Sequence, residues 1–441
     1  MPTSSSAPSR APSYATVLRT PHAARTFGAA LLGRLSYGMV PLALLLAIKD
    51  ATGSYSVAGA AMALFGAASV FLSPARAALI DRYGPRRVLP PMAGLYAAAL
   101  GALALVTWRP GTPPLALGAL AVAAGVCTPP LGPVMRTLWS GLVPDRELLR
   151  RAYSLDGVAE ELLYVTGPLL VGLIVRAGRP AAGVLAGAVL VFVGALALVS
   201  SPAVPRRHTS PEPAPSDVPV APRLRLHAIP ALRHAVLVTA AVGLCLGALD
   251  LLVVAFTEQL HRAAAVSWVL AALSAGSAVG GLAYGAVRWR TTNRVRLVVA
   301  AAGMGAALMV AGLSPRLYVL VAVVAVAGLF VAPVLTTAYL IADESVDAAR
   351  RTQAGAWVNT AFNAGSSGGT AAVGLLVGRL PLALCFALAA APALLCAAAS
   401  VRLRSRLAGA EAGAEAEAEA EAEAGGPGQR SLIAPPSAIR V

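Results

Sequence analysis

Long apolar runs separated by short charged gaps dominate this chain. Twelve such runs lie at residues 26–48, 54–80, 88–107, 113–143, 152–175, 181–200, 234–257, 264–287, 296–313, 316–341, 352–378 and 381–401. A helix needs about 20 apolar residues to cross a bilayer, and these runs are of that length or longer. The pattern therefore predicts an all-α membrane protein with twelve transmembrane helices in two groups of six.

Polar segments precede, separate and follow the two groups. Residues 1–25 are rich in Ser, Pro and Ala, residues 201–233 are rich in Pro and Arg, and residues 406–441 are dominated by alternating Glu and Ala. None of them has the apolar residues to form a core, so we expect an N-terminal arm, a linker and a disordered tail. The two six-helix bundles are then residues 26–200 and 234–405.

Composition supports a membrane location and excludes a large soluble domain. The 441 residues are 57% hydrophobic and only 12% charged, whereas soluble proteins carry about 25% charged residues. The net charge of +15 comes from arginines in the gaps between apolar runs and not from a basic patch with aromatic residues. It therefore indicates membrane topology and not a nucleic-acid partner.

Arginine counts on alternate sides of the runs predict the orientation. The N-terminal arm, the even-numbered gaps and the start of the tail hold 23 arginines, against seven basic residues in the odd-numbered gaps. Positive charge accumulates on the cytoplasmic side, so both termini are expected there. The heavy use of Ala and Arg is typical of a GC-rich bacterial gene, which places the expected location in a bacterial plasma membrane.

The two halves show a weak internal repeat. Sliding the chain by 203 residues places Asp156 and Glu160 of the fifth run on Asn359 and Asn363 of the eleventh. Polar residues spaced four apart thus recur at matched positions, which suggests two pseudo-symmetric bundles. Repeated halves with a substrate site at their interface are a plan found in secondary transporters.

The sharpest local signal is the gap between the second and third runs, AALIDRYGPRR at residues 77–87. It resembles GxxxDRxGxRR, the signature loop of the major facilitator superfamily of transporters, except that Ala77 stands in place of the first glycine. The matching residues are Asp81, Arg82, Gly84, Arg86 and Arg87. Glycine permits a tight reversal between two helices, and the arginines favour the cytoplasmic side.

The resemblance implies a fold, a function and a gate. Members of the superfamily rock two six-helix halves about a central site, and the signature loop is implied to act as a latch on the cytoplasmic side. The alternative is a positively charged loop with no switching role. The corresponding loop of the second half, GLAYGAVRWR at residues 281–290, has no aspartate, so a weaker latch is expected there.

Charged residues within the runs are functional candidates because they are costly in a membrane. Arg34, Arg136 and Asp156 lie at similar depths, roughly 8–12 Å from the cytoplasmic boundary, so Arg136 and Asp156 are placed to pair. Glu160 is one turn deeper, where desolvation favours a protonated carboxyl that can exchange a proton. We expect Glu160, with Asp156, to carry the proton. The alternative is a static ion pair that holds helices together.

Other polar residues complete the candidate site. Asp250 in the seventh run is either a further proton or cation site or a water-exposed group near the outer mouth. Asn359 and Asn363 either bind substrate or hydrogen-bond neighbouring helices. With Arg34, Tyr37 and Arg136, they form the substrate cavity that we expect.

The fifth run contains TGPLLVG at residues 166–172, which resembles the antiporter motif of the superfamily. Gly167, Pro168 and Gly172 are expected to kink the helix and allow close approach. Val171 replaces a glycine of that motif, so a generic kinked helix is the alternative. The sugar-porter signatures PESPR and PETKG are absent.

The sequence carries no signature of an enzyme or an ATP-driven pump. Walker, HExxH and GxSxG motifs and paired-cysteine zinc patterns are absent, so we expect no cofactor, no metal and no ATP. The sequence predicts a monomeric exporter of a small organic compound, a drug or metabolite, which the proton gradient drives. The alternatives are a proton-coupled nutrient symporter and a non-transporting membrane sensor or assembly protein with the same fold.

Overall fold

The computed structural model describes residues 13–109, 111–143, 145–205, 226–262 and 265–402. Helices form nearly all of this part of the chain, which confirms the predicted all-α membrane fold. Ten of these helices are long and apolar enough to cross a membrane, and one bent pair forms a further span. The predicted tail from residue 406 onward and most of the predicted linker lie outside the described residues.

The N-terminal half begins with a short helix that precedes the first span. Its helices are α1 (Tyr14–Arg19), α2 (Ala23–Thr52), α3 (Tyr55–Phe71), α4 (Ser73–Tyr83), α5 (Pro85–Thr107), α6 (Pro114–Cys127), α7 (Leu131–Leu142), α8 (Arg146–Ala177) and α9 (Pro180–Ser200). The second span is thus the pair α3 and α4, and the fourth span is the pair α6 and α7.

The second and fourth spans are each divided into two helices. The chain bends by 41° between α3 and α4, where Pro74 lies in the first turn of α4. The fourth span is interrupted between α6 and α7, where Pro129 and Pro130 follow Thr128. Proline lacks the N–H that a continuing helix needs and clashes with the preceding turn, so these breaks follow from the sequence.

The C-terminal half contains six long helices. They are α10 (Pro230–Gln259), α11 (Val266–Ala286), α12 (Asn293–Ala311), α13 (Leu317–Glu344), α14 (Arg351–Leu376) and a last helix, Leu382–Arg402. Short 3₁₀ turns precede α10 at Leu226–Ala228 and α14 at Ala348–Arg350. The first of these turns and the start of α10 lie inside the segment that the sequence predicted as linker.

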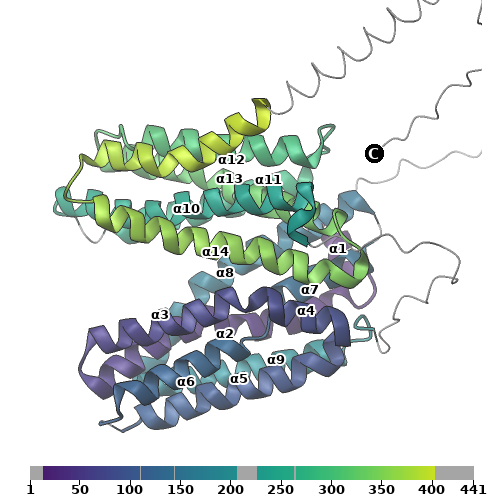
Figure 1. Ribbon diagram of the computed structural model, residues 1–441, viewed down its shortest axis with the longest axis vertical. Coiled ribbons are helices and arrows are strands. Elements are labelled where there is room, and N and C mark those ends of the chain that lie inside the picture. Colours follow the sequence, from purple (N-terminus) through teal and green to yellow (C-terminus); the bar gives the residue numbers. More distant parts are fainter. Residues whose placement is uncertain (1–12, 110, 144, 206–225, 263–264, 403–441) are drawn as a thin grey trace, which may run out of the picture.

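One long helix, α14, is more polar than the others. It is not among the helices apolar enough to be counted as a span by composition, because its middle contains Asn359, Asn363 and the run of Ser and Gly at residues 365–369. Its 26 residues are nevertheless about 39 Å long, enough to cross a bilayer. It packs along α10, so that twelve spans result (Figure 1).

Glycines allow the helices within each half to pack backbone against backbone. Gly243 and Gly247 of α10 lie against the backbone of α14 at Phe362 and Ser366, where a Cβ atom would collide. Gly38 of α2 lies in the same way against α8. Small residues at helix contacts are typical of membrane proteins, which lack a hydrophobic driving force between helices.

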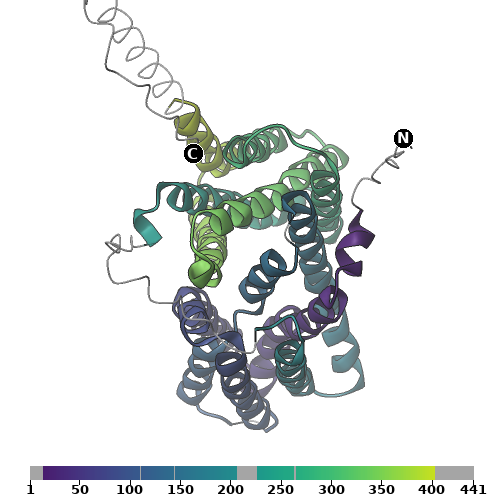
Figure 2. The same ribbon diagram turned by 90° about the vertical axis from the view of Figure 1, so that its right-hand side faces the viewer.

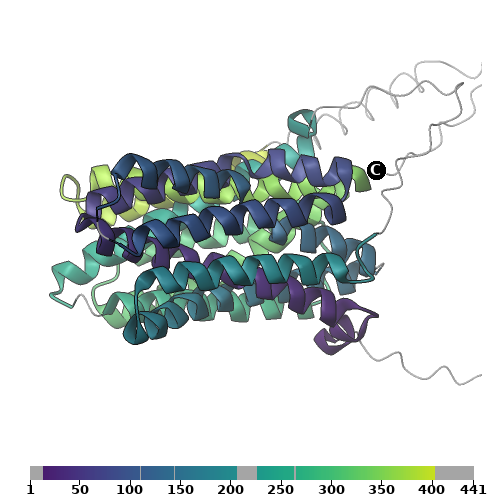
Figure 3. The ribbon, with the colours of Figure 1, turned by 90° about the horizontal axis from the view of Figure 1, so that it is seen from below.

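The two halves meet at one end of the molecule and splay apart toward the other (Figure 1). We call the closed end the arginine-rich end, because it carries the loop at residues 81–87, the start of α8 and the connection between α11 and α12. Figure 2 looks onto this end, with the N-terminal half below and the C-terminal half above. In Figure 3 the helices of both halves run along one common direction.

Candidate functional site

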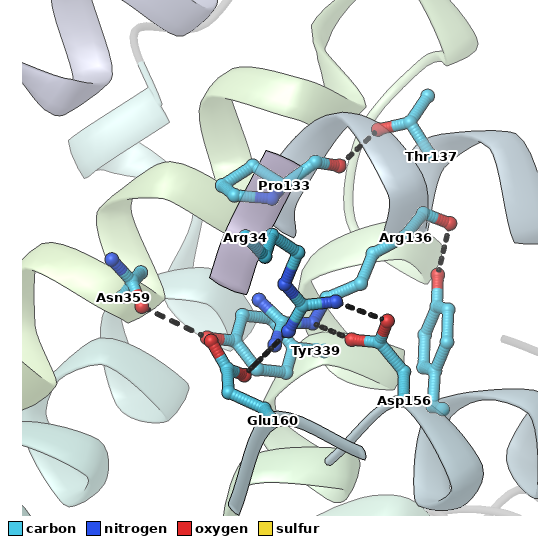
Figure 4. A network of polar contacts seen from close by, with 9 residues as sticks. Arg34, Pro133, Arg136, Thr137, Asp156, Glu160, Tyr339 and Asn359 are labelled. Carbon is cyan, nitrogen blue, oxygen red and sulfur yellow. Dashed lines mark hydrogen bonds and ion pairs between the residues drawn. The ribbon is translucent and has the colours of Figure 1, made fainter. Parts of the chain in front are cut away.

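Two arginines and two carboxylates form a buried network inside the N-terminal half (Figure 4). Arg34 lies 2.7 Å from Asp156 and 3.0 Å from Glu160, and Arg136 lies 3.1 Å from Asp156 and 2.6 Å from Glu160. Each arginine therefore contacts both carboxylates. The structure brings Arg34 together with Arg136, Asp156 and Glu160, of which the sequence had paired Arg136 with Asp156.

Local structure explains how these residues meet. Asp156 and Glu160 are four residues apart on α8, which places both on one face of the helix. Arg136 on α7 reaches that face from the preceding, antiparallel helix. Arg34 reaches it from α2, which approaches α8 closely because Gly38 and Gly167 meet backbone to backbone.

The network balances its own charge. The side chains of Arg34 and Asp156 are 1% and 0% exposed, that of Arg136 is 7% exposed and that of Glu160 is 26% exposed. Removing one partner of such a set leaves a buried charge without compensation, which costs several kcal/mol. Each carboxylate is paired with both arginines, so the condition for Glu160 to exchange a proton, freedom from its arginine neighbour, is not met in this conformation.

Aromatic and amide side chains connect the network to the C-terminal half. The guanidinium of Arg136 lies over the ring of Tyr339 on α13, 3.9 Å from its centre. The hydroxyl of Tyr339 donates to the side-chain oxygen of Asn359, at 3.5 Å, and the side-chain amide of Asn363 donates to the backbone carbonyl of Asn359 at 2.8 Å. The two asparagines of the predicted substrate cavity thus lie on the opposite half, beside the network.

A small cavity lies on the other side of Arg136, toward the arginine-rich end. Its volume is about 10 Å³, room for about one water molecule. The residues that line it come from both halves: Pro133, Arg136, Thr137, Tyr153, Tyr339, Ala342, Asp343, Arg351 and Gly355. This cavity therefore lies between the two halves, next to Arg136 of the network.

Tyr37, predicted in the substrate cavity, has its hydroxyl engaged by backbone. It donates to the carbonyl of Pro129 in the break between α6 and α7. Arg76, 6% exposed, serves the same break: its guanidinium donates to Gly125 at 2.8 Å and Val126 at 3.0 Å, and also to Ser69 of α3. These carbonyls lie in the last turns of α3 and α6, where helix ends leave carbonyls short of donors, so Arg76 stabilises both broken spans.

The predicted gate loop joins the two halves. Asp81, near the end of α4, accepts a hydrogen bond at 2.8 Å from the backbone N–H of Gln353 in the first turn of α14. A carboxylate at a helix N-terminus is favoured by the helix dipole. Gly84, with a positive φ of 85°, makes the reversal into α5, as predicted for a residue without a side chain.

The arginines of the loop make different contacts. Arg86 donates to the backbone carbonyls of Ser201 at 3.0 Å and Val204 at 3.1 Å, just after α9, so it fixes the loop to its own half. Arg82 lies over the ring of Tyr83, at 5.1 Å, and both Arg82 and Arg87 are exposed. Asp81 therefore links the loop directly to the opposite half through its hydrogen bond to Gln353.

The corresponding place in the second half carries a contact of reversed polarity. Arg151 of α8 donates to Gly285 at 3.0 Å, and Arg150 donates to Val287 at 2.5 Å, both carbonyls at the end of α11. Here positive groups meet a helix C-terminus, whereas Asp81 meets a helix N-terminus. The missing aspartate of this loop is thus matched by arginines on the facing helix, a pairing that the sequence comparison did not find.

The remaining predicted residues lie away from the network. Asp250 is an exposed residue about two thirds of the way along α10. The motif at residues 166–172 lies within α8, which continues unbroken through Pro168. Gly167 contacts the backbone of Gly38, whereas a Cβ atom at Gly172 would have nothing within 4 Å. In the described part of the chain, no group of three or more His, Cys, Asp or Glu side chains is placed to hold a metal ion.

The membrane spans of the described residues, the small residues at their contacts and the buried charges define a multi-pass membrane transporter built of two related halves. The family model of the Major Facilitator Superfamily matches residues 26–262 and 235–439. The chain therefore belongs to the major facilitator superfamily, and it is a transporter and not an enzyme, as predicted.

Known relatives and solved structures agree with this assignment. The chain is 27% identical over 311 residues to the multidrug efflux pump Tap of Mycobacterium tuberculosis and to that of Mycobacterium bovis, a match that covers 66% of this chain and 71% of each pump. Its fold is similar to that of a bacterial homologue of the iron transporter ferroportin in an outward-facing state, with a TM-score of 0.68 and 15% identity over 87% of this chain and 99% of the other.

Two further solved structures share the fold. The human organic anion transporter MFSD10 gives a TM-score of 0.64 at 16% identity, with 88% of this chain and 99% of the other covered. The Escherichia coli fucose:proton symporter FucP gives 0.63 at 15% identity, with coverage of 87% and 99%. At such identities the likeness concerns the fold alone.

Proposed function

We propose that this transporter exports a small organic compound, a drug or metabolite, in exchange for protons, by alternating access of a central site to the two sides of a bacterial plasma membrane. The observation that carries the proposal is the buried charge network of Arg34, Arg136, Asp156 and Glu160 beside the junction of the two halves. The similarity to a multidrug efflux pump supports export. Export in exchange for protons requires no ATP and no cofactor.

In this proposal the arginine-rich end faces the cytoplasm, as do both termini, because arginines accumulate on that side. The contacts of Asp81 with Gln353 and of Arg151 with Gly285 close that end. The conformation is then open toward the outside, where a compound leaves and a proton enters. Release of these contacts would open the cytoplasmic side in a transporter that works as a monomer.

Asn359 and Asn363 are proposed to bind the compound with donors and acceptors from the C-terminal half. Arg34 and Arg136 hold the facing surface of the N-terminal half in place, with Tyr37 supporting the adjoining helix break. The sequence prediction gives the proton to Glu160 with Asp156, which requires that the two arginines release them in another conformation. A role for Asp250 as a further proton or cation site remains a prediction.

Purified protein in liposomes with an enclosed pH-sensitive dye tests the function. An imposed proton gradient is combined with ethidium, chloramphenicol and fucose as probes of three chemical kinds. Proton movement that one probe triggers in the direction opposite to the probe supports export by exchange. Proton movement in the same direction as the probe would show symport, and probe movement that is indifferent to the proton gradient would contradict coupling.

A further inference from the structure

Glu161 is the residue beside Glu160 on α8, and its surroundings differ from those of its neighbour. Consecutive residues of a helix point about 100° apart, so Glu161 turns from the network toward the C-terminal half. The hydroxyl of Ser277 on α11 donates to its carboxylate at 3.1 Å. Among the described residues this is its one hydrogen-bond or ion-pair partner, and no cation contacts it.

The position of this contact is at the edge of the closed interface. Along the α8–α11 pair, Ser154 packs against Gly285, where a Cβ atom would lie 2.9 Å from it, and Val158 packs against Gly281 in the same way at 3.2 Å. Glu161 and Ser277 continue this row by one more turn, away from the start of α8 at the arginine-rich end. Glu161 is also the sixteenth of the 32 residues of α8, at the middle of the span.

The charged groups on the helices around Glu161 are occupied elsewhere. Glu160 on its own helix acts on it as a like charge and is bound to two arginines. The ionisable groups that face it from packed helices have their own partners: Arg34 and Arg136 in the network, Tyr339 against Arg136, Tyr284 with Thr337, and Asp343 with Arg351. None of these contacts supplies Glu161 with a positive charge.

We infer that Glu161, and not the network carboxylates, exchanges the proton, and that its hydrogen bond to Ser277 transmits the protonation state to the junction of the halves. Protonating Glu160 or Asp156 would leave a buried arginine without compensation. Protonating Glu161 removes a charge that no cation balances, and a neutral carboxyl is less costly than a charged one in the partly buried α8–α11 contact. The proton comes from water at the open end and bonds to a carboxylate oxygen of Glu161.

This inference rests on the proposed proton-coupled function, and its test separates the two. Wild type, Glu161→Gln, Glu160→Gln and, as a matched control, Glu258→Gln at the exposed end of α10 are placed in liposomes with the pH dye and the probe that wild type moves. We expect Glu161→Gln to lose probe-driven proton movement while keeping exchange of labelled for unlabelled probe. Glu258→Gln is expected to behave as wild type.

Infrared difference spectroscopy gives a readout that needs no probe. Titration across the neutral pH range should show a protonated carboxyl band in wild type and in Glu258→Gln that is missing in Glu161→Gln. Ser277→Ala leaves the carboxyl in place and should move the midpoint of that titration upward by about one pH unit, because the ionised form loses its one donor. This variant keeps the inference testable where Glu161→Gln does not fold.

The outcomes are distinct. Probe-coupled proton movement in wild type that persists in Glu161→Gln overturns the inference and leaves the proposed function standing. A carboxyl band that Glu160→Gln removes and Glu161→Gln retains overturns it as well, and returns the proton to the network. Failure of wild type to couple any moved probe to protons overturns the proposed function and the inference together.

Discussion

The carboxylate of Asp81 accepts a hydrogen bond from the backbone N–H of Gln353 across the junction of the two halves, with 2.8 Å between the nitrogen and the Oδ2 atom. The donor belongs to the first turn of α14, where N–H groups have no helical acceptor. A side chain of the signature loop thus contributes to closing the arginine-rich end by capping a helix of the other half, alongside the contacts of Arg150 and Arg151 with the end of α11.

Replacing Asp81 by Asn should loosen the closed end. The amide keeps the geometry but loses the charge, which we expect to cost about 1–2 kcal/mol of closure. Spin labels at the exposed positions Tyr83 and Arg290, in a background without cysteine, report the separation of the halves. A longer distance should become populated in Asp81→Asn and not in the control Asp50→Asn. An unchanged distance distribution would assign the loop to topology alone.

Replacing Arg151 by Gln should act in the same direction. The variant removes a positive group from the carbonyls at the end of α11, again at a cost of about 1–2 kcal/mol. Arg146→Gln is the matched control, because Arg146 is 88% exposed and lies 4.0 Å from Glu344, a surface pair worth at most about 1 kcal/mol. The same spin labels measure the effect.

Combining the two changes tests whether the contacts are independent. They lie on different helix pairs, α4 with α14 and α8 with α11, so their effects on the closed state should add. An effect of the double variant no larger than that of Asp81→Asn would show that one contact alone holds the end closed.

A double-mutant cycle should measure the coupling between charges of the network. Asp156→Asn and Arg34→Met each leave a buried charge unpaired, and each should lower the stability by about 3–5 kcal/mol. The double variant leaves Arg136 and Glu160 as a balanced pair, so its loss should be well below the sum. Unfolding midpoints in detergent, followed by tryptophan fluorescence, give the comparison, and additive losses would refute the balance.

Two glycines of the predicted antiporter motif should respond oppositely to the same change. Gly167→Val places a side chain into the backbone of Gly38, which should separate α2 from α8 and abolish folding or transport. Gly172→Val meets open space and should change the stability little. The yield and monodispersity of each variant in detergent measure whether it folds. Equal tolerance of both changes would contradict a close α2–α8 approach.

The helices were predictable because apolar runs of membrane length leave few alternatives. The breaks at Leu72 and at residues 128–130 lie beside prolines. The spans were delimited by their apolar runs, and those runs continue through both breaks. Depth in the membrane correctly suggested that Arg136 and Asp156 meet. It could not show that Arg34 joins them, because contacts between α2 and α8 depend on where Gly38 and Gly167 cross.

For several site residues the sequence showed a charge but not the group that it contacts. Arg76 was evident as a charge within an apolar run, but its partners are backbone carbonyls that have no sequence signature. Arg150 and Arg151 read as topology signals, and only the structure places them against the end of α11. Glu161 is next to Glu160 in the sequence, but it points to another side of α8, and only the structure shows that this direction brings it to Ser277.

The polarity of α14 bears on how the protein is made. Asn359, Asn363 and the Ser and Gly run at residues 365–369 make this helix a poor substrate for insertion by hydrophobicity alone, because polar residues at a helix centre oppose transfer from the translocon to lipid. Its glycine-lined contact with α10 offers the alternative environment. We expect α14 to remain with the insertion machinery until α10 receives it, so that synthesis of the C-terminal half ends in a concerted assembly step and not in the release of independent helices.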